Sequence, residues 1–301
     1  MIYSIDRPPS DSQLRAVKPN RYSISANARV LARYGQPVPP YQPAPGPAGC
    51  GVIDVALTRA ELRSSEIAVV IDVLRATSVA TQALAAGYQR VLCAESIERA
   101  ETLRGDGRVL AGERHCLKPE GFDQGNSPRE ARHRRGHELV LATTNGAPAI
   151  LAAAGLAAEV LLACLLNFEA VLAELGRRDP GTRELQLVCS GTDGAVALED
   201  VYVAGRLSAR LPGPKTDAAL VAEAVARAFP TSVRALGAGA DARVLRAAGL
   251  GDDIADCARE SQLDLVPRVS SADAGVAVIV AGDRSADPEA KATAVSADPD
   301  A

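Results

Sequence analysis

The sequence contains no tryptophan, and aromatic residues make up only 3% of its 301 positions, although 47% of the residues are hydrophobic. The apolar content therefore comes mainly from Ala, Val and Leu. This composition argues against an aromatic-rich β-sandwich and favours thin helices packed on strands, as in an α/β architecture. A chain of this length can bury one large core or two modest ones.

An excess of positive charge is also lacking. The 33 basic and 37 acidic residues give a formal net charge of -4, so no overall positive field would attract nucleic acid or an anionic membrane. A site for an anion must then be local. We expect neither nucleic acid nor membrane as a partner, and the sequence does not indicate the oligomeric state.

Several motifs that would point to other classes of protein are missing. No charge-free apolar run reaches membrane-spanning length, and residues 1–10 include charges and prolines where a secretory signal needs an unbroken apolar run. The six cysteines form no CxxC pair, and the three histidines lack zinc-ligand spacing. No P-loop, GxSxG or GxGxxG motif lies between a strand and a helix. These absences predict a cytoplasmic protein with reduced, mostly buried thiols.

The two ends of the chain differ in composition from the middle. Residues 37–49 read PVPPYQPAPGPAG, which disfavours both helix and strand. The far end is rich in Ala, Asp, Ser and Pro without an apolar period. The sequence therefore predicts a Pro-rich disordered tail over residues 1–50, one domain over 51–282, and a disordered tail over 283–301.

Between the tails, short β-branched runs alternate with Ala- and Leu-rich stretches of helical spacing, which is typical of βα units. We expect a three-layer α/β/α fold with a mostly parallel or mixed sheet. Strands are expected at residues 52–57, 67–73, 91–94, 109–112, 138–143, 159–164, 185–190, 263–267 and 276–281. Helices are expected at residues 77–86, 217–229 and 241–248, and near Ser127, Ala147, Asn167 and Ala197.

Four clusters of unusual polar residues directly follow predicted strands. In open α/β sheets, ligands bind outside the carboxyl ends of the strands, so the four clusters could meet in one pocket. Their Ser, Thr, Asn and Gly residues could hold an oxyanion at helix starts, although each alone could simply cap a helix. The clusters are residues 72–78 (DVLRATS), 112–128 (GERHCLKPEGFDQGNSP), 143–147 (TTNGA) and 189–200 (CSGTDGAVALED).

Charged residues in these clusters suggest both an anion and a hard cation as ligands. Arg75 directly follows a buried strand, where a surface cation would be poorly placed, and guanidinium suits phosphate or sulfonate oxygens. Asp72 ends the same apolar strand, and carboxylates of this kind suit magnesium. A structural Asp72–Arg75 pair is the alternative explanation. Glu199 and Asp200 have a second explanation as well, because acidic residues stabilise helix starts.

Taken together, the clusters resemble the successive blocks of the 2-phosphosulfolactate phosphatase (ComB) family, in the family's order. The resemblance runs from about residue 52 to residue 268, and as an ordered set it is specific. The blocks are VVIDVLRATSVATQAL (69–84), AGERHCLKPEGFDQGNSPRE (111–130), LATTNGAPAI (141–150), LLNFEAV (165–171), CSGTDGAVALEDVYVAGRL (189–207) and GLGDDIADCARESQLDLVP (249–267).

The resemblance implies a three-layer α/β fold and magnesium-dependent hydrolysis of 2-phospho-3-sulfolactate to 3-sulfolactate and phosphate, a step that in the family belongs to coenzyme M biosynthesis. Ala147, Ala197 and the His115–Cys116 pair depart from the family pattern and affect the expected substrate preference more than the chemistry. Two alternatives stay open. One is a phosphatase of another small phosphorylated hydroxy acid, and the other is a non-catalytic anion-binding protein on the same scaffold.

The expected site combines these residues around one magnesium ion and one phosphorylated anion that also carries sulfonate or carboxylate groups. Whether Asp72 attacks phosphorus or only binds the metal is left open. The expected residues are Asp72 and Arg75 for catalysis; Arg114, Lys118, Asn126, Ser127, Thr143, Thr144, Asn145, Ser190 and Gly191 for substrate binding; and Asp72, Glu113 and Asp200 for Mg²⁺.

Overall fold

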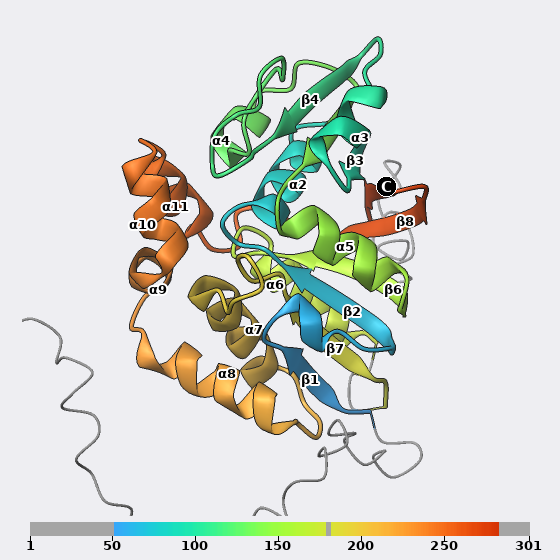
Figure 1. Ribbon diagram of the computed structural model, residues 1–301. Helices are drawn as coiled ribbons and strands as arrows, with labels where there is room; N and C mark the ends of the chain where they lie inside the picture. The colour runs from blue at the N-terminus through green and yellow to red at the C-terminus, as the bar shows by residue number, and fades with distance from the viewer. Residues whose placement is uncertain (1–50, 179–181, 283–301) are drawn as a thin grey trace, which may run out of the picture. The chain divides into compact units, whose positions relative to one another are not determined.

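The computed structural model of the chain describes residues 51–178 and 182–282 (Figure 1). The two predicted tails lie outside these ranges, so their disorder stays a prediction. Within the described ranges, nine strands form one mixed sheet in the order β1-β7-β2-β6-β8-β9-β3-β5-β4. The strands are β1 (Ile53–Ala56), β2 (Ser65–Ile71), β3 (Arg90–Ala94), β4 (Arg108–Gly112), β5 (Glu138–Ala142), β6 (Ala157–Ala163), β7 (Leu185–Cys189), β8 (Pro267–Asp273) and β9 (Val276–Ala281).

The sheet consists of two parallel blocks joined by an antiparallel hairpin. Strands β1, β7, β2 and β6 are parallel to one another, and so are β3, β5 and β4. The β8–β9 hairpin between them is antiparallel to both blocks and within itself, so the two blocks run in opposite directions. Sheets twist by roughly 20–25° per strand, which amounts to roughly 100–125° over the steps from β2 to β5. The twist therefore turns the carboxyl ends of both blocks toward a common side.

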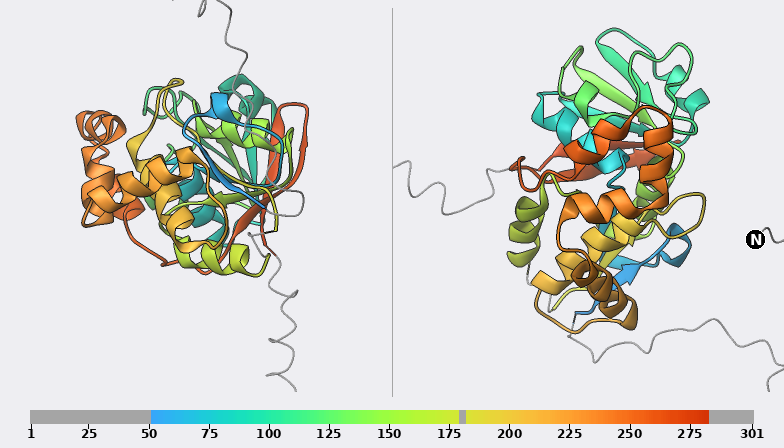
Figure 2. Two further views of the ribbon diagram at one scale, coloured as in Figure 1. Left: turned by 90° about the horizontal axis from the view of Figure 1, so that it is seen from below. Right: turned by 90° about the vertical axis from the view of Figure 1, so that its left-hand side faces the viewer.

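Helices cover both faces of this sheet, as the three-layer prediction requires (Figures 1 and 2). The helical segments are η1 (Arg59–Glu61), α2 (Ala76–Ala85), α3 (Ile97–Thr102), α4 (Pro128–Ala131), α5 (Gly146–Ala154), α6 (Phe168–Gly176), α7 (Leu198–Arg210), α8 (Asp217–Ala228), α9 (Ser232–Ala238), α10 (Ala240–Ala247) and α11 (Gly251–Cys257). Helices α9–α11 form a group that contacts α7 and α4. This group therefore reaches both the α7 side and the α4 side of the site described below.

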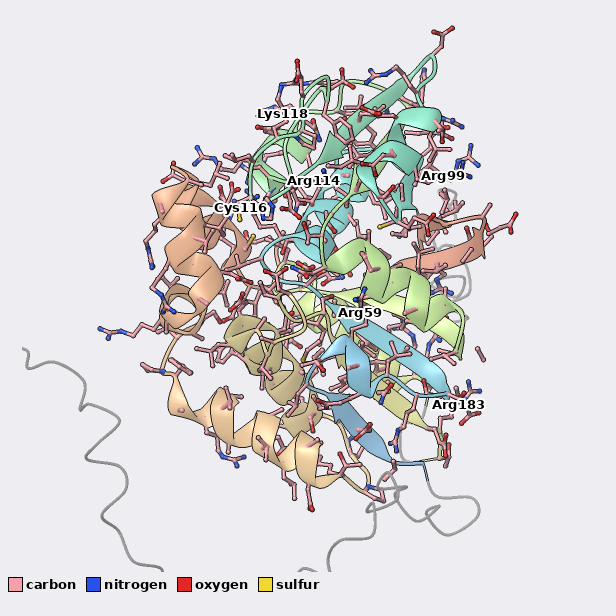
Figure 3. The ribbon with its side chains drawn as sticks, viewed as in Figure 1. Arg59, Arg99, Arg114, Cys116, Lys118 and Arg183 are labelled. Carbon is pink, nitrogen blue, oxygen red and sulfur yellow. The ribbon has the colours of Figure 1, made fainter. Side chains whose placement is uncertain are left out.

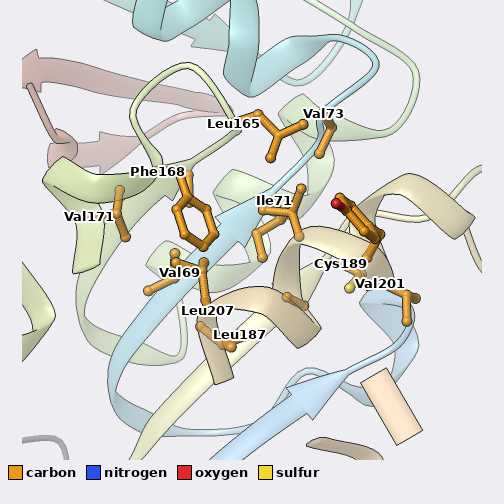
Figure 4. Packing of buried hydrophobic residues seen from close by; sticks show 14 of the residues in the cluster. Val69, Ile71, Val73, Leu165, Phe168, Val171, Leu187, Cys189, Val201 and Leu207 are labelled. Carbon is orange, nitrogen blue, oxygen red and sulfur yellow. The ribbon is translucent and has the colours of Figure 1, made fainter. Parts of the chain in front are cut away.

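The side chains of β2 alternate between the two faces of the sheet, which shows why the fold has three layers. Val69 and Ile71 point into a core that α6 and α7 complete, with Phe168 at its centre (Figure 4). Ala68 and Val70 point to the other face, where α2 and α5 pack. Because successive strand residues face opposite sides, a strand that is apolar throughout must be covered on both faces. The all-apolar run of β2 thus requires helices above and below it.

Two parts of the sequence-based assignment differ from the structure. The strand expected at residues 263–267 was wrong, because β8 begins at Pro267 and continues through Asp273. Most of β8 is polar and half-exposed, since it pairs mainly with β9 and meets β6 only at Leu161–Arg268. Helices α3, α9 and α11 were not predicted. They are six or seven residues long, too short for a helical period to be recognised.

The predictions about membrane spans and thiols can also be compared with the structure. Across the described ranges, no helix has the length and apolar character needed to span a bilayer. The five cysteines in these ranges are free, and all but Cys116 are buried. Burial raises the pKa of the Cys93 thiol to about 12, which keeps this buried thiol protonated.

Packing of α7 on α8 provides a test of the fold. A Cβ atom at Gly205 would lie 1.9 Å from the backbone oxygen of Ala222, so Gly205→Ala should force the two helices apart. We expect this substitution to lower the free energy of unfolding by about 1–3 kcal/mol, measured by urea denaturation. Gly176→Ala is the matched control, because no atom of the described residues lies within 4 Å of the added carbon. Equal stability of the two variants would contradict the packing described.

Candidate active site

The carboxyl ends of β2, β4, β5 and β7 surround one small cavity, which α10 closes from the side. The cavity has a volume of about 60 Å³, room for about two water molecules or a group of similar size. Larger hollows of about 380 and 580 Å³ lie over α7–α8 and α8–α10, away from the polar clusters. The lining residues of the small cavity are Asp72, Leu74, Arg75, Glu113, Cys116, Asn126, Thr143, Asn145, Thr192, Asp241 and Leu245.

Asp72 lies at the end of β2 with little access to water. Its Oδ1 accepts a hydrogen bond from the backbone N–H of Ala76 (2.9 Å), in the first turn of α2. Its Oδ2 lies so close to Gly146 that a Cβ there would be 2.5 Å away, so only glycine fits at this position. Burial, together with the nearby carboxylates of Asp241 and Glu113, raises the pKa of Asp72 to about 7. This carboxyl group therefore exchanges a proton near neutral pH.

Arg75 is buried three residues later, and its partner is not Asp72. Its Nη1 donates to Oδ2 of Asp253 at 2.5 Å, and both side chains are almost fully buried. Asp253 lies in the first turn of α11, a helix that the sequence did not predict. The structural Asp72–Arg75 pair considered as an alternative is thus replaced by an Arg75–Asp253 pair. Asp72 is left available to a ligand in the cavity.

Glu113 connects two of the polar clusters. Its Oε1 accepts from the backbone N–H of Thr144 (2.7 Å) and its Oε2 from that of Cys116 (2.9 Å). His115 and Cys116 have φ angles of 52° and 64°, and Arg114 and Leu117 exchange both backbone hydrogen bonds. This is the geometry of a type I′ turn, here built without glycine. Glu113 therefore holds the turn that carries Cys116 into the cavity wall.

The β7–α7 segment closes the opposite wall. Thr192 Oγ1 donates to Asp241 Oδ2 (2.5 Å), and the backbone N–H of Asp193 donates to Asn145 Oδ1 (3.1 Å). A second tight turn follows, with φ of 51° at Asp193 and 80° at Gly194. These contacts join the β5, β7 and α10 sides of the cavity. Asp241 was predicted only as part of a helix, so its place in the site was missed.

Two carboxyl groups lie behind the wall, at the start of α7. Asp200 accepts from the backbone N–H groups of Val73 (2.9 Å) and Gly191 (3.2 Å), which ties the ends of β2 and β7 together. Glu199 Oε2 is buried without a hydrogen-bond partner in the described part of the chain. Burial and the Asp241 carboxylate raise the pKa of Glu199 to about 8, and burial also raises the pKa of Asp200 well above its ordinary value.

The predicted residues fall into two groups. Asp72, Arg75, Glu113, Asn126, Thr143 and Asn145 line the cavity. The others do not. Ser127 donates its hydroxyl proton to Asp253 (2.7 Å), Asp200 lies behind the wall with Ser190 and Gly191, and Thr144, Arg114 and Lys118 are exposed. Figure 3 shows Arg114 and Lys118 on the same side of the molecule as Cys116, which lines the cavity.

Residues that the sequence did not single out complete the site. Leu74, Thr192 and Leu245 contribute to the wall beside Asp241, together with Cys116, which the sequence had marked only as a departure from the family pattern. Leu74 and Thr192 are inside the recognised clusters, so proximity to the predicted residues was their only signal. Asp241 and Leu245 come from a helix about 170 residues after Asp72, and nothing local to that helix marks it as part of a site.

The donor set was also compared with what magnesium requires. Among the described residues, no three His, Cys, Asp or Glu side chains already form a metal-binding group. Magnesium, however, usually takes one or two carboxylates and fills its other positions with water and substrate phosphate. Burial, and after it neighbouring carboxylates, raise the pKa values of Asp72, Glu199 and Asp200, and a nearby divalent cation would favour the charged forms of these groups. The carboxylates that line the cavity, Asp72, Glu113 and Asp241, are donors of the kind that magnesium takes.

Replacing Asp72 by Asn should stabilise the protein at high pH when a chelator is present. The pKa of Asp72 is about 7 in the folded state against an ordinary 3.8, so the folded state keeps a proton that the unfolded state releases. Wild-type stability therefore falls as the pH rises through this window, whereas Asn stays neutral. The advantage of Asp72→Asn should grow from near zero at pH about 4 to about 1–4 kcal/mol at pH about 8.

Urea denaturation at a series of pH values measures this difference. Asp106→Asn, at an exposed position between α3 and β4, is the control and should show no such trend. A constant difference between Asp72→Asn and wild type across the pH range would mean that Asp72 titrates normally.

Comparison with known proteins agrees with the resemblance drawn from the motifs. The profile of the 2-phosphosulpholactate phosphatase family matches residues 54–272. A probable 2-phosphosulfolactate phosphatase of Thermus thermophilus is 40% identical over 208 residues, which cover 67% of this chain and 87% of the relative. Probable 2-phosphosulfolactate phosphatases of Pseudothermotoga lettingae and Deinococcus radiodurans are 34% and 36% identical. These two matches cover 72% and 69% of this chain and 95% and 89% of the relatives. The chain therefore belongs to the 2-phosphosulfolactate phosphatase family of phosphoric monoester hydrolases.

Proposed function

We propose that the protein hydrolyses 2-phospho-3-sulfolactate to 3-sulfolactate and inorganic phosphate in a magnesium-dependent reaction. The observation that carries the proposal is the convergence of Asp72, Arg75, Asn126 and Asn145, from three separate loops, on one cavity. The names of the relatives support the substrate. In this proposal the reaction breaks the bond between phosphorus and the ester oxygen, and water supplies the new oxygen on phosphorus.

Phosphate monoesters are among the slowest esters to hydrolyse unaided, so positioning and charge stabilisation must supply most of the rate. Arg75 would hold the phosphoryl oxygens with the part of its guanidinium that Asp253 does not engage. Asn126 and Asn145 would orient the same group from the opposite loops. Asp72 would present its carboxylate at the reacting end of the cavity.

Magnesium would be held by Asp72, with Asp241 and Glu113 as neighbouring carboxylates. When bound, it would neutralise charge on the phosphoryl oxygens as a Lewis acid. Glu113 already accepts two backbone hydrogen bonds and Asp200 another two, so we propose that these two carboxylates mainly fix the loops. This assignment leaves Asp72 as the principal ligand among the residues predicted for the metal.

The size of the cavity supports a division of the substrate between two places. The cavity, with a volume of about 60 Å³, would receive the phosphoryl group. The sulfonate and carboxylate would then remain at the mouth, where Arg114 and Lys118 are exposed. Arg114 pairs with Glu98 only at 3.4 Å and with both side chains exposed, a contact weak enough for a bound anion to displace.

Release of phosphate from 2-phospho-3-sulfolactate tests the proposal directly. Wild-type protein should release phosphate with magnesium and stop when a chelator is added. Asp72→Asn should lower turnover by about 10²–10³-fold or more, because it removes a charged group at the reacting centre. Asp106→Asn, the exposed control, should keep wild-type turnover. Near-normal hydrolysis by Asp72→Asn would refute the central assignment.

Binding can be followed separately from turnover through Cys116, the half-buried thiol in the cavity wall. Burial raises the pKa of this thiol, so alkylation is best measured at about pH 9. Magnesium with phosphate or 3-sulfolactate should slow labelling of Cys116 several-fold, as read by mass spectrometry. Cys50, in the predicted tail, should label at the same rate throughout. Unchanged labelling of Cys116 would place the anion elsewhere, and protection without turnover would indicate a non-catalytic binding protein.

A further inference from the structure

Asp253 connects three segments that are far apart in the sequence. Its side chain is 3% exposed. One carboxylate oxygen accepts from Arg75 at the end of β2 (2.5 Å), and the other accepts from Ser127 at the start of α4 (2.7 Å). Nothing in the sequence clusters pointed to it, and it does not line the cavity. In the described part of the chain, its link to the cavity is the contact with Arg75, and Ser127 holds it from the other side.

Stability alone is a poor explanation for this contact. Burying an ion pair costs desolvation energy that often cancels the Coulomb attraction, so such pairs contribute little net stability. The guanidinium has five N–H donors in a fixed plane. Among the described residues, Asp253 is the one side chain recorded as accepting from Arg75, and it engages Nη1 alone. The remaining donors are left for the cavity that Arg75 lines.

The geometry points to Asp253 as a positioning residue that fixes the Arg75 guanidinium in the orientation needed to bind a phosphoryl group. This inference rests on the proposed phosphatase function. An arginine side chain has many rotamers, and an anion must immobilise it on binding unless the protein has already done so. The Asp253 carboxylate holds one edge of the planar guanidinium and leaves its other edge free. A guanidinium fixed in this way also keeps its N–H donors aligned as charge develops on the phosphoryl oxygens.

The hydrogen bond from Ser127 to Asp253 gives Ser127 a role different from the substrate binding that was predicted. A hydroxyl has a single proton to donate, and the Ser127 proton goes to Asp253. Ser127 therefore supports the position of Asp253, and through it that of Arg75, instead of donating to a substrate oxygen. Helix α11 reaches the site by this route, and ion pairs such as Arg129–Asp256 add to its contact with α4.

A double-mutant cycle tests whether Asp253 acts through Arg75. Asp253→Asn should lower kcat/KM by about 10- to 100-fold, mostly through kcat, as expected when a reacting group is displaced by about an ångström. In the Arg75→Gln background the same change should cost less than about threefold, because the group being positioned is gone. Asp252→Asn is the matched control. Its side chain is exposed on the same turn of α11 and, within residues 51–178 and 182–282, pairs only with Arg129 on the surface, so the kinetics of this variant should be those of wild type.

Two results would overturn the inference. One is an equal loss on Asp253→Asn in both backgrounds, and the other is wild-type kinetics in folded Asp253→Asn. If that variant does not fold, Asp253→Glu keeps the buried charge but displaces it by one methylene, and wild-type kinetics there would also overturn the inference. Wild-type protein that releases no phosphate would instead count against the proposed function. In that case the cycle can be repeated with the affinity for phosphate, measured by calorimetry in the presence of magnesium. Asp253→Asn should then weaken phosphate binding only in proteins that retain Arg75.

Discussion

The site depends on how a twisted sheet brings together two blocks of strands that run in opposite directions. In a flat sheet, the reversal introduced by β8 and β9 would send the carboxyl ends of β2 and β5 to opposite edges. Because the twist accumulates over the strands between them, both ends face the same cavity, and Asp72 meets Glu113 and Thr143 there. In the hairpin that separates the blocks, β8 is largely polar and exposed, whereas β9 is apolar and packs into the core. None of its side chains lines the cavity, so the hairpin acts on the site by setting the directions of the strands.

Once these ends converge, electrostatics determines what the cavity can hold. Asp72, Glu113, Asp241 and Arg75 line it, with Glu199 and Asp200 close behind, and Arg75 is already paired with Asp253. The folded protein thus gathers carboxylates in a place with little water, which raises the pKa values of several of them. Such an arrangement costs stability and is typical of functional sites. A cation that neutralises it would at the same time prepare the cavity for an anion.

Most of the fold and part of the site could be predicted from the sequence. Strands such as β2 and β7 are short apolar runs, and their ends were placed within about two residues, because burial on both faces leaves a clear apolar signal. Asp72 and Arg75 stood out because a charged side chain next to a buried apolar strand needs a partner or a ligand to offset its desolvation. Local pattern could not reveal β8, whose polar residues face solvent, or the short helix α11.

The missing site residues share a physical cause. Asp241 and Asp253 are acidic residues in the first turns of short helices, where the helix dipole alone would account for them. Only the packing of α10 and α11 against distant loops gives them partners, Thr192 for one and Arg75 for the other. Tertiary contacts between segments more than 170 residues apart, such as that from Arg75 to Asp253, leave no periodic trace in a single sequence.

One cavity that accepts both a divalent cation and a phosphoryl group is central to the proposed function. A crystal structure of the protein with manganese in place of magnesium and with phosphate tests this most directly, since anomalous scattering identifies the metal. We expect a manganese peak beside the carboxylate of Asp72 and a phosphate against Arg75, Asn126 and Asn145. A metal bound away from Asp72, or a phosphate bound outside this cavity, would contradict it.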